Sequence, residues 1–240
     1  MPMIGERDRQ AIRSMFEKLD GRVVALVFSE QPSRLVVPGE RNCMYCRETV
    51  QLVQELAEAA GDGKVQVEVY DRRAQPEMLE AYGVDRVPAI VVTDPDRRLR
   101  GVRYFGIPAG YEFTTLVESM MDVASGQTRL SERTRKALAS LRTPVHLKVF
   151  VTPTCPYCPK AVRLAHQFAM ENPQITADMI EATEFPELAQ QYGVRGVPRT
   201  VINETEFIEG AVPENYLLQV VLTTVGLEPP AEEGAEDGQA

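Results

Sequence analysis

The sequence is short of the residues that mark several specialised classes of protein. Its 240 residues include four cysteines, two histidines and no tryptophan. Small secreted domains that depend on disulfides carry many more cysteines per residue, which argues against a disulfide-stabilised framework. No stretch approaches the roughly 20 consecutive apolar residues of a membrane span, and residues 1–8 lack the apolar core of a signal peptide. We therefore expect a cytoplasmic protein with no membrane partner.

Basic residues are also in the minority. Lysine and arginine number 26 against 35 aspartates and glutamates, so the net charge is −9. Residues 1–125 carry −4, residues 126–227 are neutral and residues 228–240 carry −5. The last segment has no apolar periodicity and is predicted to be a disordered acidic tail. Because nucleic-acid binding requires a basic surface, we predict no nucleic-acid partner.

The chain is long enough for one large or two small domains, and an internal repeat favours two. Shifting the sequence by 110 residues brings segment 76–88 onto segment 186–198, with identical residues at seven of the 13 positions. The cysteine pairs align at a shift of 112. We define unit one as residues 1–125 and unit two as residues 126–227.

Both units are predicted to have the same order of elements, an α/β pattern of β-α-β-α-β-β-α after a leading helix. The leading helices are expected at about 8–19 and 130–141. The strands of unit one are expected at 23–28, 65–70, 89–93 and 102–105. Those of unit two are expected at 145–151, 175–180, 200–203 and 206–208. Unit one also carries an insertion, predicted to be a loop at 30–42, before its cysteine pair.

The four cysteines form two pairs, each with a two-residue gap: Cys43-Met44-Tyr45-Cys46 and Cys155-Pro156-Tyr157-Cys158. This spacing permits either a disulfide or a shared metal. Zinc ribbons place the second pair roughly 15–20 residues after the first, whereas 108 residues separate the pairs here. A redox-active pair, used twice, is therefore the leading interpretation, and no metal ligands are predicted.

Each pair is predicted to open the amphipathic helix that follows the first strand of its unit. The free N–H groups and positive dipole end of a helix N-terminus stabilise a thiolate, which is the attacking species in disulfide exchange. Cys43 and Cys155 are therefore expected to attack, while Cys46 and Cys158, one turn deeper, resolve the mixed disulfide. Tyr45 and Tyr157 lie inside the pairs and are candidate substrate contacts.

The Cys-x-x-Cys pairs, a Val-Pro about forty residues after each and the order of elements together resemble the thioredoxin fold. The tandem arrangement is similar to the glutaredoxin-like protein disulfide oxidoreductases of thermophilic archaea and bacteria. Residues 152–159 and 101–106 carry this resemblance most specifically, and it covers roughly residues 4–227.

The resemblance implies an enzyme that forms, reduces or isomerises protein disulfides. It implies that both cysteine pairs are redox-active and that the sheets of the two units join side by side. Val87–Pro88 and Val197–Pro198 should be cis, should face the sulfurs and should bind substrate. No cofactor is expected to be bound. Protein dithiols and disulfides are the implied substrates, and an NADPH-dependent thioredoxin-reductase-like flavoprotein is the implied electron donor.

The sequence departs from thioredoxins proper at two positions. Thr154 stands where thioredoxins have tryptophan, and Val149 where they have a buried aspartate. No proton acceptor for Cys158 is therefore evident, although Asp71 and Glu181 hold matched places after the second strands.

Two other functions compete with the leading one. An electron-relay module of a peroxide reductase system uses the same chemistry, but such modules have usually lost their first cysteine pair, and Cys43 and Cys46 are present here. A metal or iron–sulfur protein of thioredoxin-like shape is the alternative from another class. Within the leading hypothesis, Cys155 is expected to be more reactive than Cys43, because unit two is neutral and has no insertion before its pair. Lys160, Arg195 and Arg199 also lie near Cys155 in the sequence.

Overall fold

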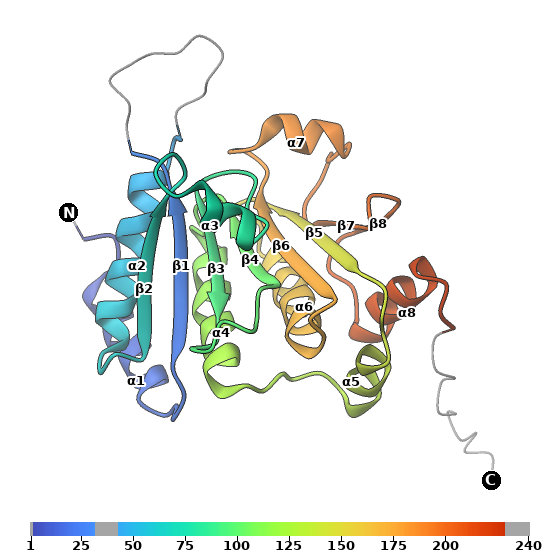
Figure 1. Ribbon diagram of the computed structural model, residues 1–240, viewed down its shortest axis with the longest axis horizontal. Coiled ribbons are helices and arrows are strands. Elements are labelled where there is room, and N and C mark those ends of the chain that lie inside the picture. The colour runs from blue at the N-terminus through green and yellow to red at the C-terminus, as the bar shows by residue number, and fades with distance from the viewer. Residues whose placement is uncertain (1, 32–42, 229–240) are drawn as a thin grey trace.

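The computed structural model describes residues 2–31 and 43–228 (Figure 1). The predicted tail beyond residue 228 and residues 32–42 of the predicted insertion lie outside the described residues.

Each unit contains the predicted order of elements. Unit one consists of α1 (Glu6–Phe16), β1 (Val23–Ser29), α2 (Cys46–Ala60), β2 (Val65–Asp71), α3 (Pro76–Ala81), β3 (Ala89–Thr93), β4 (Val102–Phe105) and α4 (Tyr111–Ser125). Unit two consists of α5 (Glu132–Ala139), β5 (Val145–Val151), α6 (Cys158–Glu171), β6 (Ile175–Glu181), α7 (Pro186–Gln191), β7 (Arg199–Ile202), β8 (Glu206–Glu209) and α8 (Glu214–Thr224). Regular helix begins at the second cysteine of each pair, later than predicted, so Cys43 and Cys155 lie just ahead of the helices.

The strands of both units form one eight-stranded sheet in the order β2-β1-β3-β4-β6-β5-β7-β8 (Figure 1). This confirms the expectation that the two sheets join side by side. The seam is a parallel pairing of β4 with β6, from Val102 opposite Ala177 to Phe105 opposite Ile180. Gly101 permits the close approach at the start of the seam, because a Cβ atom there would lie 2.4 Å from the carbonyl oxygen of Ile175.

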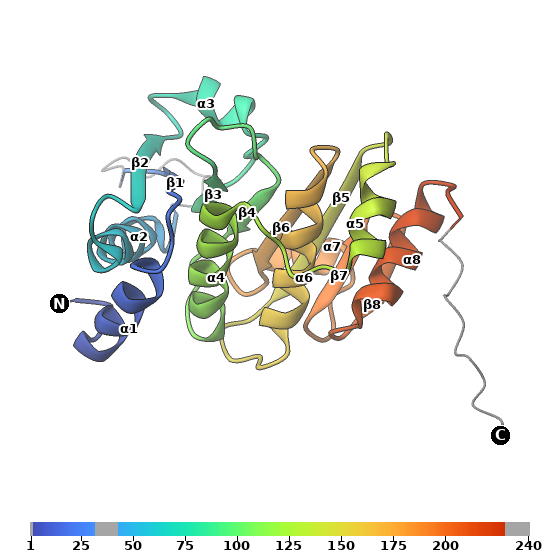
Figure 2. The ribbon, with the colours of Figure 1, turned by 90° about the horizontal axis from the view of Figure 1, so that it is seen from below.

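Helices cover both faces of the sheet. One face packs on a large core with apolar residues from α1, α2, α4, α5, α6 and α8. The other face packs on a smaller cluster that includes Met78 and Leu79 of α3 and Leu188 and Ala189 of α7. Figure 2 shows α1, α2, α4 and α6 below the strands and α3 above them. No helix in the described part of the chain is long and apolar enough to cross a membrane.

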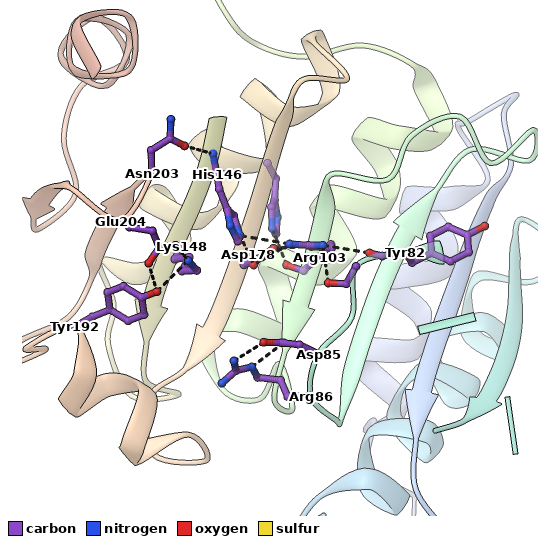
Figure 3. Close-up of polar contacts among 12 residues, drawn as sticks. Tyr82, Asp85, Arg86, Arg103, His146, Lys148, Asp178, Tyr192, Asn203 and Glu204 are labelled. Carbon is purple, nitrogen blue, oxygen red and sulfur yellow. Dashed lines mark hydrogen bonds and ion pairs between the residues drawn. The ribbon is translucent and has the colours of Figure 1, made fainter. Parts of the chain in front are cut away.

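A buried ion pair joins the units on the face that carries α3 and α7 (Figure 3). Arg103 of β4 places its Nε 2.6 Å from Oδ1 of Asp178 on β6, and a terminal guanidinium nitrogen donates to Oδ2 at 3.0 Å. His146 Nε2 lies 2.6 Å from the same Oδ2. Burial raises the pKa of Asp178, but the bond with His146 and the charge of Arg103 outweigh it and hold that pKa below its ordinary value. Because Arg103 and Asp178 come from different units, this pair holds the seam in register.

Candidate active sites

The two cysteine pairs lie at the same end of the sheet, beside the ends of β1 and β5. These strands are four places apart in the sheet, which separates the pairs by about 19 Å at ~4.8 Å per strand. The four sulfurs therefore do not converge on one site. Among the described residues, no group of three or more histidine, cysteine, aspartate or glutamate side chains is arranged to hold a metal ion.

Site one, the Cys43–Cys46 pair, is a disulfide with a Cα–Cα distance of 5.6 Å. The N–H of Glu30, the first residue after β1, donates to Cys46 Sγ at 3.2 Å. The Glu30 carboxylate is buried, and it lies 3.2 Å from Arg72 and 2.7 Å from Arg73. Site one thus has an acidic neighbour from its own unit, Glu30, which is paired with two arginines.

Site two, the Cys155–Cys158 pair, consists of two buried thiols. The thiol of Cys155 donates to the carbonyl oxygen of Val197 at 3.5 Å. Cys158 is fully buried, and burial raises the pKa of its thiol. The neighbouring Cys155 sulfur and the charge of Glu112 raise this pKa further. Cys155, 8% exposed, therefore lies nearer the surface than Cys158, whose burial favours the protonated thiol.

The acid beside Cys158 is Glu112, which belongs to α4 of unit one. Its side chain is 2% exposed, and neither carboxylate oxygen has a hydrogen-bond partner in the described structure. Burial raises the pKa of Glu112 to about 7. The group can therefore change its protonation state near neutral pH.

Sequence reasoning missed Glu112 and considered Asp71 and Glu181 instead. Those two carboxylates accept hydrogen bonds from the turns that follow their own strands. The available signal was an acid at the start of the apolar stripe of α4, four residues before the buried Leu116. Its proximity to Cys158 depends on the packing of α4 against α6, which the sequence does not display.

Both Val–Pro bonds, Val87–Pro88 and Val197–Pro198, are cis. The loops that contain them differ in exposure. Val87 is 7% exposed, and the preceding Arg86 lies over the ring of Phe185 from unit two, 5.5 Å from its centre. Val197 is half-buried, and the preceding Gly196 is exposed with open space around it.

The predicted tyrosine contacts are exposed, whereas the predicted cation Arg199 is paired with other side chains. Tyr157 is 69% exposed and Tyr45 is 38% exposed, so both rings are accessible beside the sulfurs. Arg199, a cation expected to favour the Cys155 thiolate, forms an ion pair with Glu209 and lies 4.1 Å over the ring of Phe207. Its charge is therefore largely compensated on β8.

Comparisons with known proteins agree with this arrangement. A family model described as a thioredoxin domain matches residues 35–118 and again residues 145–223. A protein disulfide oxidoreductase from Aeropyrum pernix is 33% identical with a TM-score of 0.82, and the match covers 93% of this chain and 95% of that one.

The alkylhydroperoxide reductase AhpF from Enterococcus faecalis is 26% identical with a TM-score of 0.80, covering 91% of this chain and 99% of the solved chain. Its counterpart from Staphylococcus epidermidis is 29% identical over 141 residues, which is 59% of this chain and 26% of that protein. The chain thus spans between about a quarter and a third of the length of the curated relatives it matches.

Proposed function

The chain belongs to the thioredoxin-domain family and is a thioredoxin-like disulfide oxidoreductase, and we propose that it forms, reduces or isomerises protein disulfides through two catalytic pairs. Those pairs are Cys43 with Cys46 and Cys155 with Cys158. The observation that carries the proposal is the geometry of site two. An attacking thiol faces the carbonyl oxygen of Val197 before a cis proline, and a fully buried thiol lies beneath it.

In the direction of reduction, the Cys155 thiolate attacks one sulfur of a substrate disulfide. The Cys155–substrate disulfide forms, and the other substrate sulfur leaves as a thiolate. The Cys158 thiolate then attacks the Cys155 sulfur, so that the Cys155–Cys158 disulfide forms and the second substrate thiolate leaves. The substrate gains two electrons and the enzyme pair loses two. The reverse sequence oxidises a substrate dithiol.

Glu112 is proposed to accept the proton that Cys158 must lose before the second attack. The charge of Glu112 raises the pKa of Cys158, so the two groups are not readily ionised together and one of them holds a proton. As Cys158 becomes a thiolate, the proton passes to Glu112 and then to a departing substrate thiolate. Unit one therefore supplies an acid–base group to the chemistry of unit two.

The backbones of Val87–Pro88 and Val197–Pro198 are proposed to bind the substrate segment beside the sulfurs, with Tyr45 and Tyr157 as aromatic contacts. Electrons are proposed to come from an NADPH-dependent thioredoxin-reductase-like flavoprotein. The proposal includes a cytoplasmic location and units that extend over residues 1–125 and 126–227; α4 ends at Ser125, before a Gly126 of positive φ.

A relay within a peroxide reductase system is the second candidate function. It is favoured by the likeness to the alkylhydroperoxide reductase AhpF, which covers 91% of this chain. Retention of the first pair favours the broader enzyme, because a relay that serves one partner at site two has no use for Cys43 and Cys46.

Two assays of the full chain distinguish these functions. The first follows reduction of insulin disulfides by dithiothreitol with catalytic amounts of protein. The second follows NADPH consumption with a thioredoxin-reductase-like flavoprotein and a peroxidase. Rapid insulin reduction that is lost in the Cys155→Ser/Cys43→Ser variant supports the broad enzyme; activity in the peroxidase assay alone supports the relay. Stoichiometric iron or zinc in purified protein, without a reducible disulfide, would overturn both.

A further inference from the structure

The backbone of unit one contacts the segment that leads into site two. Gly110 and Tyr111 begin α4 of unit one, and the Tyr111 N–H donates to the carbonyl oxygen of Pro153 at 3.1 Å. Pro153 precedes Cys155 by two residues, a chain distance of at most about 7 Å. The contact is close because Gly110 lacks a side chain: a Cβ atom there would lie 2.2 Å from the Pro153 oxygen.

The two residues after Gly110 have opposite surroundings. Glu112 is buried, and its charge acts on Cys158, whereas Tyr111 is 52% exposed. Tyr157, from unit two, is also exposed and follows Cys155 by two residues. The active-site segment 153–157 therefore has the backbone of one exposed tyrosine held against its start and another exposed tyrosine at its end, and the two residues come from different units.

We propose that Tyr111 is a specificity-determining residue of site two that binds the polypeptide flanking a substrate disulfide. The inference rests on the proposed oxidoreductase function and adds a substrate contact to it. A tyrosine ring presents a large apolar face with a hydroxyl at its edge, and such rings carry much of the binding free energy at protein surfaces. A protein substrate is wide enough to cover this ring while its disulfide reaches Cys155. A small disulfide reaches Cys155 without touching it.

The test uses a protein with the Cys43→Ser and Cys46→Ser substitutions, so that turnover comes from site two alone. Tyr111→Ala is compared with the parent on insulin and on bis(2-hydroxyethyl) disulfide, with dithiothreitol as reductant. For insulin, kcat/KM is expected to fall about 5- to 30-fold, the loss produced by removing a ring worth ~1–2 kcal/mol. For the small disulfide it is expected to stay within about twofold, because that substrate does not use the ring.

Two matched variants complete the design. Tyr111→Phe keeps the ring and is expected to retain most insulin turnover. Tyr216→Ala removes a tyrosine of α8 that is exposed to a similar extent, 49%, and is expected to change the turnover of neither substrate.

Equal losses on both substrates would show that Tyr111 only supports the active-site segment, and unchanged insulin turnover would show that the ring binds nothing. Either result overturns the proposal. Failure of the parent protein to turn over either disulfide would instead count against the proposed function of site two.

Discussion

The two units share one order of elements, but the second cysteine of each pair has a different acidic neighbour. Glu30 comes from the same unit as site one, and its carboxylate lies between Arg72 and Arg73. Glu112 comes from the other unit, and within the described residues its carboxylate has no hydrogen-bond partner. Burial, with no compensating ion pair among the described residues, raises the pKa of Glu112 to about 7, so it can exchange a proton near neutral pH, as the proposed step at Cys158 needs. The β4–β6 seam brings α4 against α6. The acidic neighbour of site two therefore comes from the other unit, whereas the acidic neighbour of site one comes from its own unit.

The exposure of the two Val-Pro loops, which are proposed to bind substrate, also favours site two. Val87 is buried and Arg86 extends over a ring of unit two, whereas Val197 is half-exposed beside the open Gly196. The Val197 segment is thus the more accessible of the two to a substrate backbone. Because Val87 is buried and Arg86 is engaged with Phe185, we expect site two to be the more active of the two.

The largest expected effect is the loss of the site-two nucleophile. In a protein whose only intact pair is Cys155–Cys158, Cys155→Ser is expected to lower insulin turnover at least about 1,000-fold, because a hydroxyl cannot take part in disulfide exchange. In the matched protein, only the Cys43–Cys46 pair is intact. Its insulin turnover is expected to be lower from the start, so Cys43→Ser should cause a smaller absolute loss. Alkylation rates measured across pH are expected to show Cys155 as the faster thiol. Higher turnover by the site-one protein would reverse the comparison of the two units.

The next effect concerns stability. Glu112 has an ordinary pKa of 4.5 and a folded-state pKa of about 7. The folded protein therefore binds the proton more tightly, and wild-type stability falls as pH rises from about 4.5 to about 7. Glu112→Gln removes this loss, which at 1.36 kcal/mol per pKa unit amounts to as much as ~3 kcal/mol. Urea unfolding is expected to show the variant more stable at about pH 8 and nearly equal to wild type at about pH 4.

Glu55 provides a control of opposite sign. Burial raises its pKa, but hydrogen bonds from Gln51 and from two backbone N–H groups outweigh that effect and lower it to about 2. Folding therefore favours the charged form of Glu55, and that stabilisation is present at neutral pH and lost only as pH falls toward about 2. Glu55→Gln should lower stability at about pH 8. A loss of stability from Glu112→Gln under the same conditions would mean that an unseen partner compensates its charge.

The elements that occur in both units are the ones that the sequence predicted well. The strands at Ala89–Thr93, Val102–Phe105 and Val145–Val151 have the predicted bounds, because short apolar runs between turn residues define both of their ends. The duplicated segment 76–88 likewise marked the short helix and the Val-Pro loop of each unit. Local periodicity and turn chemistry are sufficient for such elements.

The side-chain contacts between the two units could not be predicted from the sequence. Arg103 and Asp178 are 75 residues apart, and Glu112 and Cys158 are 46 apart. Each pairing depends on the register of the β4–β6 seam, and a register is a tertiary property with no local sequence signal. The resemblance to tandem oxidoreductases implied that the sheets join, but it named no side chain across the seam.

A smaller effect on activity tests the role of Glu112. In the protein with site two alone, Glu112→Gln is expected to lower kcat on insulin about 10- to 100-fold, because the amide cannot accept the proton of Cys158. Wild-type kcat should fall as pH drops below about 7, where Glu112 becomes protonated, and the variant should lack this step. Glu184→Gln is the control, since burial also raises the pKa of Glu184 to about 7 while its carboxylate accepts the N–H of Ile107. Parallel pH profiles for Glu112→Gln and wild type would remove Glu112 from the mechanism.

The smallest expected effect tests whether unit two limits access to site one. Arg86 is paired with Asp85 (Figure 3) and lies over Phe185 of unit two, at a cleft between the units. Arg86→Gly gives site one the residue that unit two has before its own Val-Pro. A cation–π contact at a partly exposed position contributes ~0.5–1 kcal/mol, so its removal should raise insulin turnover about 2- to 5-fold in the protein with site one alone. Turnover of bis(2-hydroxyethyl) disulfide should not change, because so small a substrate makes little contact with the Val87–Pro88 loop.

Asp85→Ala controls for loss of the ion pair. It should leave the turnover of insulin and of the small disulfide close to that of the protein with site one alone. If Arg86→Gly lowers insulin turnover, the arginine itself contacts the substrate, and the difference between the sites arises from their acidic neighbours rather than from access.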